Sequence, residues 1–362
     1  MHQTIPKFSR GAVDRAARAL TSDTSANQQD DSLWEILGNW RGAHAFPLNT
    51  VTVDLKQKVN REQLPALVVQ RLKRSRSILG KLAKEPSMRL TQMQDIGGCR
   101  AVVPTIEDVY ALRDRYRQSR SLHELVAEDD YISEPKTSGY RGVHLVYRFR
   151  SRSRPEFNRL LLEVQLRSLP QHAWATAVET VGAIVGQALK SSEGEVAWLK
   201  YFQLASLALE YAEQPAYVRD MPLSRGTVAR GLAEFEKKLE VRKKLSAYRT
   251  ALRATEHPKA KDARYFLLVL LPEEPGLQIF AFNRDQSELA QTEYQRFERQ
   301  LPLRSKQLSL FPDLADYSGA QVVLVGAESM RSIKAGFPNY YLDTGDFLEK
   351  TDSFIQKFKR AT

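Results

Sequence analysis

The chain has 362 residues, of which 42% are hydrophobic, 9% aromatic and 27% charged, a balance that excludes wholesale disorder. Lysine and arginine number 54 against 43 aspartate and glutamate residues, so the formal net charge is +11, which favours polyanionic partners. The single cysteine, Cys99, excludes an internal disulfide and a multi-cysteine zinc site.

Hydrophobic periodicity over the first 255 residues predicts an α/β (α+β) fold, with helices around a mixed sheet of four or five strands. Strands are expected at 96–103, 123–126, 143–149 and 160–167. Helices are expected at 10–20, 32–43, 62–84, 106–116, 170–189, 195–213 and 224–255.

The segment TEHPKAKDAR at 255–264 then has the composition of a linker. Beyond it, strands 265–271 and 277–282 flank the turn PEEPG and predict a hairpin. A helix at 285–300, a strand at 322–325 and helices at 328–336 and 345–358 complete a second, small α/β domain. We therefore expect two domains, 1–255 and 256–362.

The segment from 71 to 84 carries six basic residues and no acidic one. On a helix, Lys73, Ser77 and Lys81 would be spaced i, i+4, i+8 and form one row, which suits a triphosphate. The alternative is a solvated helix face, although such a face normally carries acidic residues as well.

Asp95 stands before Gly97 and Gly98 at the entrance to an apolar strand. A carboxylate at such a position can hold Mg²⁺, which takes one or two carboxylates together with phosphate oxygens. A structural turn is the alternative for so short a motif.

The loop PKTSGYRGVH at 135–144 combines glycines, cations and an aromatic residue expected to be exposed. In such a loop Tyr140 can stack on a base while Lys136 and Arg141 contact phosphate. The alternative is a hairpin turn in which the tyrosine packs against its surroundings.

In the expected strand 160–167, Glu163, Gln165 and Arg167 alternate with apolar residues and therefore share one face. Three polar groups on one face of an apolar strand favour a functional site, because burying them without partners is costly. A solvated sheet face is the alternative.

Together these clusters resemble the synthetase domain of the RelA/SpoT family, the alarmone pyrophosphokinases, over about residues 40–190. The shared motifs, in the same order, are R-x-K…S-I…K, D-I-x-G-x-R, P-K-x-x-G-Y-R-x-x-H, E-x-Q-x-R and the following Q-H-A-W-A. The resemblance implies the RelA/SpoT synthetase fold. No His-Asp pair occurs in the sequence, so the family's hydrolase activity is not expected.

The resemblance also implies roles for individual residues. Asp95 and Glu163 would be catalytic and hold Mg²⁺, and Glu163 would also activate the acceptor hydroxyl. The residues implied to bind ATP are Arg71, Lys73, Ser77, Lys81 and Arg100. Those implied on the acceptor side are Lys136, Tyr140, Arg141, His144, Gln165 and Arg167.

The C-terminal part resembles the antitoxin module of the CapRel fused toxin–antitoxin proteins, described as a degenerate zinc finger. The segment FPNYYLDT at 337–344 is similar to the Y-x-x-Y segment of that module, with Phe337 in place of the first tyrosine. The resemblance implies that Phe337, Tyr340 and Tyr341 are autoinhibitory. The alternative is a loop whose aromatic residues pack the small domain.

Three functions remain open at this point. The first is a toxic synthetase that transfers pyrophosphate from ATP to the 3′-OH of the tRNA CCA end, released from inhibition by a phage protein. The arginine-rich segment 141–159, and ten basic against four acidic residues in 236–264, favour it. The second is a (p)ppGpp or (p)ppApp synthetase that acts on GDP, GTP or adenosine nucleotides.

The third is an inactive nucleotide- or RNA-binding module, against which the presence of Asp95, Tyr140 and Glu163 argues. The sequence shows no apolar run of membrane-spanning length and no secretory signal pattern at its N-terminus. A cytoplasmic protein without membrane contact is therefore expected.

Overall fold

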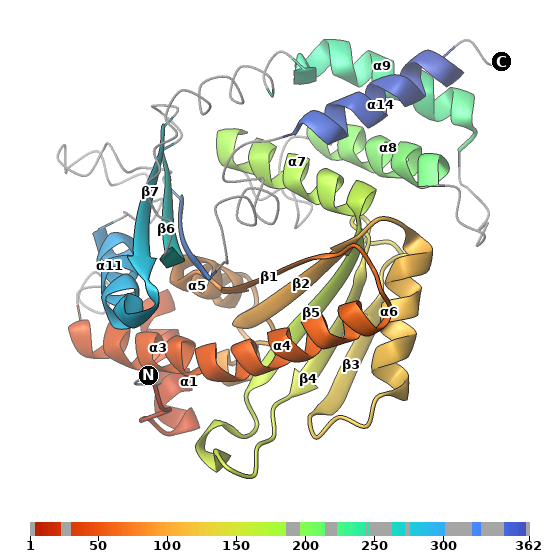
Figure 1. Cartoon of the computed structure of the whole chain (residues 1–362). Helices are drawn as coiled ribbons and strands as arrows, with labels where there is room; N and C mark the ends of the chain where they lie inside the picture. The colour runs from red at the N-terminus through yellow and green to blue at the C-terminus, as the bar shows by residue number, and fades with distance from the viewer. Residues whose placement is uncertain are drawn as a thin grey trace, which may run out of the picture.

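The computed structural model describes residues 4–22, 30–185, 196–213, 223–242, 245, 263–271, 276–300, 321–326 and 344–359. Within these residues the strands form one eight-stranded sheet in the order β3-β4-β5-β2-β1-β8-β6-β7 (Figure 1). The strands are β1 (Leu67–Leu72), β2 (Gly97–Val103), β3 (Glu124–Asp130), β4 (Val143–Arg148), β5 (Leu161–Ser168), β6 (Ala263–Leu271), β7 (Gly276–Asn283) and β8 (Gln321–Gly326).

The first five strands form the mixed sheet that the sequence predicts. Strands β2 and β5 are parallel, whereas β1–β2, β3–β4 and β4–β5 are antiparallel. The register places Gly98 of β2 opposite Glu163 of β5, and His144 of β4 opposite Gln165. These pairings place β5 between β2 and β4, so its expected polar face lies beside residues of both strands.

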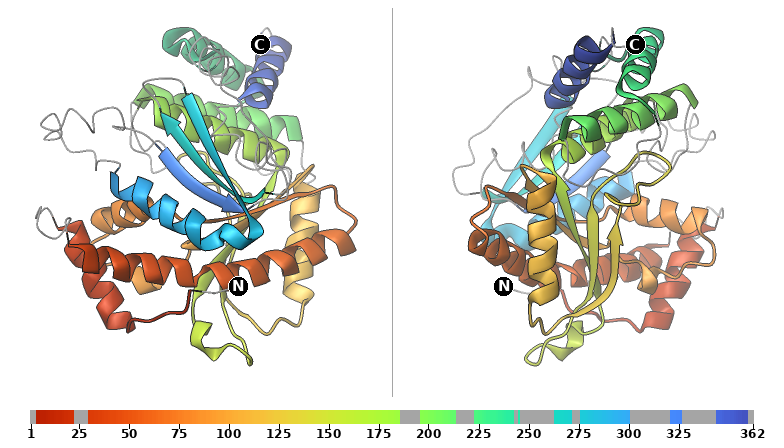
Figure 2. Two further views of the ribbon diagram at one scale, coloured as in Figure 1. Left: turned by 60° about the vertical axis from the view of Figure 1, so that its left-hand side comes forward. Right: turned by 90° about the vertical axis from the view of Figure 1, so that its right-hand side faces the viewer.

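Helices cover this sheet in two groups, which Figures 1 and 2 show from different sides. The described helices are α1 (Arg10–Thr21), α3 (Asp31–Ala43), α4 (Ala45–Arg61), α5 (Ser75–Lys84), α6 (Ile106–Gln118), α7 (Leu169–Val185), α8 (Val196–Glu213), α9 (Arg225–Leu239), α11 (Ser287–Gln300) and α14 (Gly345–Phe358). None of them combines the length and the apolar character that crossing a membrane requires.

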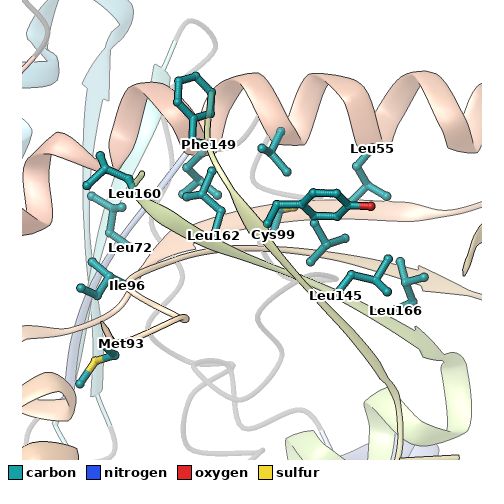
Figure 3. Packing of buried hydrophobic residues seen from close by; sticks show 14 of the residues in the cluster. Leu55, Leu72, Met93, Ile96, Cys99, Leu145, Phe149, Leu160, Leu162 and Leu166 are labelled. Atoms are coloured by element: carbon teal, nitrogen blue, oxygen red, sulfur yellow. The ribbon is translucent and has the colours of Figure 1, made fainter. Parts of the chain in front are cut away.

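The main core lies between the sheet and the helices of the N-terminal half. Leu55 of α4 packs with Cys99 of β2, Leu145 of β4 and Leu162 of β5, all nearly inaccessible to solvent (Figure 3). A second apolar cluster joins α7, α8, α9 and α14, with Phe202 of α8 between Trp198 of the same helix and Phe347 of α14.

The expectation of one helix over residues 62–84 is wrong. Residues 67–72 form β1, which pairs along its whole length with β2, and only Ser75–Lys84 are helical. The segment LVVQRL is rich in β-branched residues, and pairing with a neighbouring strand favours its extended form. The long helix α4 just before it was also not expected as a separate element.

The C-terminal strands continue the first sheet instead of forming one of their own. Strand β8 pairs with β1 at Gln70 and Arg71, and β6 pairs with β8 and β7. Helix α14 packs instead with α8 and α9. The division at residue 255 therefore stays a prediction. The helix expected at 328–336 and most of the expected linker lie outside the described residues.

The close packing at Gly97 gives a test of this core. A Cβ atom at Gly97 would lie 2.7 Å from Cδ2 of Leu162 and 3.3 Å from Cβ of His44. We expect Gly97→Ala to lower the free energy of unfolding by about 1–3 kcal/mol, because the buried neighbours must move apart. Urea unfolding followed by tryptophan fluorescence measures the change.

Gly80→Ala is the matched control. Gly80 lies in α5, and a Cβ there would meet no atom within 4 Å. Alanine at this exposed helical position should be neutral or stabilise the protein by about 0.5–1 kcal/mol. Equal stability of the two variants would contradict the packing described for Gly97.

Candidate functional site

The pocket that unites the predicted residues lies on the polar face of β1, β2 and β5. Its empty volume, including the part open to solvent, is about 360 Å³. Asp95 and Glu163 both line it, together with two arginines from neighbouring strands, Arg71 and Arg100. Two carboxylates and two guanidinium groups therefore face one space.

Two lysines meet Asp95 at one side of this pocket. Lys73 Nζ lies 2.7 Å from Asp95 Oδ2, and Lys81 Nζ lies 3.6 Å from Asp95 Oδ1. Burial alone would raise the pKa of Asp95, but the charges of Lys73 and Lys81 outweigh it and lower that pKa. Burial lowers the pKa of Lys73, and the charge of Asp95 opposes this change.

The predicted helical row of Lys73, Ser77 and Lys81 is wrong in its local structure. Lys73 lies between β1 and α5, and only Ser77 and Lys81 are on the helix. The lysines nevertheless converge, because Lys73 follows β1 directly while Lys81 comes from the last turn of α5. Arg71 belongs to β1.

The two glycines after Asp95 have different surroundings. Gly97 is required by the packing of Leu162, whereas a Cβ at Gly98 would lie 3.8 Å from its nearest neighbour, an ordinary contact. Packing in the core therefore accounts for Gly97, but not for Gly98.

Five polar side chains close a hydrogen-bonded ring at the other side of the pocket. His144 Nδ1 lies 2.8 Å from Glu163 Oε1, and His144 Nε2 lies 2.5 Å from the Tyr140 hydroxyl. Arg167 Nε donates to that hydroxyl at 3.1 Å, and its Nη2 donates to Gln165 Oε1 at 2.9 Å. Gln165 Nε2 donates to Glu163 Oε2 at 2.6 Å, which completes the ring and confirms that the polar residues of β5 converge.

The ring fixes the charges of its members. Burial would raise the pKa of Glu163, but the hydrogen bond and charge of His144, with smaller effects of Gln165 and Arg167, lower it to about 2. Burial would lower the pKa of His144, but Tyr140 and Glu163 raise it to about 9. Near neutral pH the site therefore holds a carboxylate beside a charged imidazole.

The expectation of an exposed Tyr140 is wrong. Its side chain is only 7% exposed and packs edge-to-face with Trp174 of α7, while Arg167 lies over its ring at 5.1 Å. Tyr140 lies in the loop three residues before β4 begins, and its ring belongs to the apolar cluster of the helices α7, α8, α9 and α14. Lys136 Nζ lies 5.5 Å from the centre of the same ring and 4.2 Å from that of Tyr131.

Arg141, which was predicted to lie on the acceptor side, does not belong to the ring. It is 5% exposed and forms a buried ion pair with Glu210 of α8. No local sequence pattern indicates this partner, because Glu210 lies 69 positions away. Arg141 therefore ties the loop before β4 to α8.

Two residues that the sequence analysis did not assign also contact the site. Nδ1 of His172 in α7 lies 3.1 Å from Nη1 of Arg100. Burial lowers the pKa of Arg100 well below its usual value. Arg41 of α3 donates from Nε to the carbonyl of Lys73 at 2.7 Å. The Q-H-A-W-A motif was a signal for His172, but nothing in the sequence singled out Arg41.

The residues present fit a magnesium ion. Oδ1 of Asp95 is buried and accepts no hydrogen bond within the described part of the chain, and Glu163 is ionised across the same pocket. The described residues contain no group of three or more potential ligands from His, Cys, Asp and Glu. Two carboxylates suit Mg²⁺ completed by phosphate and water oxygens, and not a protein-enclosed metal.

The hydrogen-bonded ring predicts that His144 stays protonated and charged at neutral pH. In metal-free buffer, NMR titration of the imidazole signals should place the pKa of His144 near 9, and Glu163→Gln should lower it toward 6.5. His44, whose pKa burial lowers to about 4, is an internal control that Glu163→Gln should not change. A His144 pKa at or below 6.5 in the parent would contradict the ring.

The direction of the accompanying stability change follows from the same shifts. The raised pKa of His144 contributes stability that is complete below about pH 6.5 and is lost as the pH rises through about 9. The lowered pKa of Glu163 contributes stability present above about pH 4.5 that is lost as the pH falls through about 2.

Comparisons with known proteins place this site in a family region. Residues 70–181 match the family model described as "Region found in RelA / SpoT proteins". GTP pyrophosphokinase YjbM of Bacillus subtilis (strain 168) is 33% identical over 111 residues, which are 30% of this chain and 52% of that protein. GTP pyrophosphokinase YwaC of the same organism is 29% identical over 111 residues, 29% of this chain and 52% of that protein.

Each alignment thus spans about half the length of the curated relative. Among solved structures, small alarmone synthetase 1 of Bacillus subtilis bound to its product pppGpp is similar at 25% identity and a TM-score of 0.39, over 46% of this chain and 87% of that one. The sequence comparisons thus relate residues 70–181 to a region found in RelA and SpoT proteins, and these residues include the whole ring and every pocket-lining residue except Val69.

Proposed function

We propose that the protein is a pyrophosphokinase that transfers the β,γ-pyrophosphate of ATP to a hydroxyl group of a nucleotide or of tRNA. The observation that carries this proposal is the single pocket in which Asp95 and Glu163 face Arg71 and Arg100. In the reaction, the acceptor hydroxyl loses its proton to water and its oxygen forms a bond to the β-phosphorus, while the bond between that phosphorus and the α,β-bridging oxygen breaks and AMP leaves.

The donor side has the charges that this chemistry needs. Lys73 and Lys81 neutralise Asp95 in the structure described here. Asp95 and Glu163 would hold the Mg²⁺ that accompanies ATP and neutralises its phosphates, and Lys73 and Lys81 would contact the phosphate oxygens. Phosphoryl transfer depends mainly on placing the reactants in line and on neutralising charge, which these groups supply.

Glu163 would hold the metal ion and orient the acceptor hydroxyl. A carboxylate with a pKa of about 2 is a weak base at neutral pH, so its value to the reaction lies in its charge and position. The charged His144 keeps Glu163 ionised. Gln165 and Arg167 fix the remaining carboxylate oxygen on the acceptor side.

The 3′-OH of the tRNA CCA end is the acceptor we propose, with inhibition of translation as the result. The net charge of +11 supports it, because a polyanion of that size releases counterions on binding. Part of the arginine-rich segment is already paired: Arg148 and Arg150 contact Glu124, and Arg154 contacts Glu156. The alternative acceptors are GDP, GTP or adenosine nucleotides, and of these the names of the two curated relatives mention GTP.

A transfer assay with one catalytic variant tests the activity. ATP labelled in its γ-phosphate is incubated with Mg²⁺, the protein, and GDP, GTP, ADP, tRNA or periodate-oxidised tRNA, which lacks the 3′-OH. We expect label on intact tRNA alone, and Glu163→Gln should reduce transfer on the order of 10²-fold or more. Glu62→Gln, remote from the pocket and paired with Arg115, should transfer like the parent.

The outcomes separate the alternatives. Label only on a mononucleotide would overturn the tRNA acceptor and support alarmone synthesis. Transfer to none of the acceptors by the parent and also by Tyr340→Ala, the variant in which the restraint proposed below is removed, would overturn the pyrophosphokinase. Equal behaviour of the parent and Glu163→Gln would favour an inactive binding module.

We further propose that the C-terminal part restrains the enzyme through Phe337, Tyr340 and Tyr341 until a phage protein binds it, as in phage defence. These residues lie outside the described part of the chain. The described residue Gly326, at the end of β8, is paired with Gln70 next to the pocket-lining Arg71, which supports a short path from β8 to the donor site.

Tyr340→Ala tests this restraint. We expect the variant to bind the ATP analogue AMPCPP more tightly than the full parent chain, by several-fold, because an aromatic ring that competes for the adenine position is removed. Tyr340→Phe keeps the ring and should bind like the parent. Isothermal titration calorimetry gives the affinities, and an unchanged affinity of Tyr340→Ala would contradict inhibition through this residue.

A further inference from the structure

Helix α11, from the C-terminal part of the chain, reaches the donor side of the pocket through one buried aromatic residue. Tyr294 of α11 is fully buried, and the guanidinium carbon of Arg41 in α3 lies 4.1 Å from the centre of its ring. The two residues are 253 positions apart. The helices approach closely here, since a Cβ at Gly38 of α3 would lie 3.0 Å from Nε2 of Gln295.

Arg41 connects this contact to the lysine that meets Asp95. Its Nε donates to the carbonyl of Lys73 at 2.7 Å, and the amide of Lys73 donates to the carbonyl of Ile96, also at 2.7 Å. Both backbone groups of Lys73 are therefore held. Because Ile96 follows Asp95 in the chain, these bonds fix Lys73 against the carboxylate that its Nζ contacts.

The aromatic ring supplies what the buried arginine otherwise lacks. Arg41 is 3% exposed, and its Nη2 has no hydrogen-bond partner within the described residues. A buried cation that is incompletely hydrogen-bonded is costly, and the face of an aromatic ring offsets part of that cost. Without Tyr294, the guanidinium group would be free to turn toward other partners and release the Lys73 carbonyl.

A second contact from the same part of the chain holds the preceding residues. Strand β8 pairs with β1 at Gln70 and Arg71, directly before Lys73. Helix α11 packs on the strands β6 and β8, with Tyr294 in one cluster with Leu267 and Val322. The two contacts thus converge on residues 70–73.

We infer that Arg41 and Tyr294 are positioning residues for Lys73, through which helix α11 sets the geometry of the donor-phosphate site. The inference rests on the proposed function, because the ligand of Lys73 is taken to be the phosphate chain of ATP. It gives the C-terminal part a supporting role in nucleotide binding, distinct from restraint by Phe337, Tyr340 and Tyr341.

The test compares two substitutions in the same helix and the same apolar cluster. Tyr294→Leu removes the ring over Arg41, whereas Phe297→Leu removes a ring that contacts Phe280. AMPCPP with Mg²⁺ is titrated into each full-length protein by calorimetry, and the melting temperature is measured in parallel. We expect Tyr294→Leu to raise the Kd for AMPCPP by roughly three- to tenfold, and Phe297→Leu to leave it unchanged at a similar loss of melting temperature.

Two further variants connect the effect to Arg41. Tyr294→Phe keeps the ring and should bind AMPCPP like the parent. Arg41→Gln should weaken binding, and adding Tyr294→Leu to it should cause no further loss, because the two residues act through one contact. In the transfer assay, the KM for ATP should rise in Tyr294→Leu while the KM for the acceptor stays unchanged.

The outcomes distinguish this inference from the function on which it rests. The positioning role alone would be overturned if Tyr294→Leu bound AMPCPP as tightly as the parent. It would also be overturned if Tyr294→Leu and Phe297→Leu lost affinity for AMPCPP equally. Additive losses in the Arg41→Gln, Tyr294→Leu double variant would also overturn it. A parent protein that binds no AMPCPP would overturn the proposed function and the inference together.

Discussion

The ring of hydrogen bonds among Glu163, His144, Tyr140, Arg167 and Gln165 is the constraint on which one side of the pocket depends. Polar groups taken from water need partners, and a closed ring supplies one to each member without help from solvent. The ring joins β4 to β5, and through the contact of Tyr140 with Trp174 it joins the sheet to α7. The orientation of the Glu163 carboxylate in the pocket thus depends on packing outside the pocket.

The other side of the pocket is organised by charge around Asp95. Lys73 and Lys81 approach one carboxylate from different elements, so positive charge is concentrated where phosphate is expected and Asp95 offsets only part of it. Arg100 extends this arrangement toward the ring. It is buried, and Arg167 and Arg71 add to the effect of burial in lowering its pKa. An incoming polyanion would relieve this repulsion, which favours phosphate binding between the two sides.

The C-terminal strands change the position of β1 in the sheet. Without β8, the edge of β1 facing away from β2 would expose unpaired backbone groups. Pairing at Gln70 and Arg71 covers part of this edge, and helix α14 packs with α8 and α9 at the other end of the molecule (Figures 1 and 2). The chain beyond residue 255 is thus connected to both the sheet and the helical cluster that covers Tyr140.

Local sequence was sufficient to predict the elements whose hydrophobic residues repeat with a single period, either that of a helix or that of a strand. Helices α1 and α3, strands β2, β4 and β5, and the β6–β7 hairpin lie within a few residues of their expected positions. The alternation of Glu163, Gln165 and Arg167 placed them on one face, because that follows from the geometry of any strand. The motifs of the family region identified Asp95 and Glu163 as a pair, and the fold brings both to one pocket.

Tertiary structure decided the remaining elements and side-chain positions, because these depend on partners that are far away in the chain. Residues 67–72 form a strand since β2 is there to pair with them, which a basic segment with helical spacing did not reveal. Tyr140 is buried because α7 covers it, and Arg141 turns away because Glu210 lies on α8. The contact of Arg41 with Tyr294 joins α3 to α11. No local sequence pattern around either residue indicates that the other is its partner.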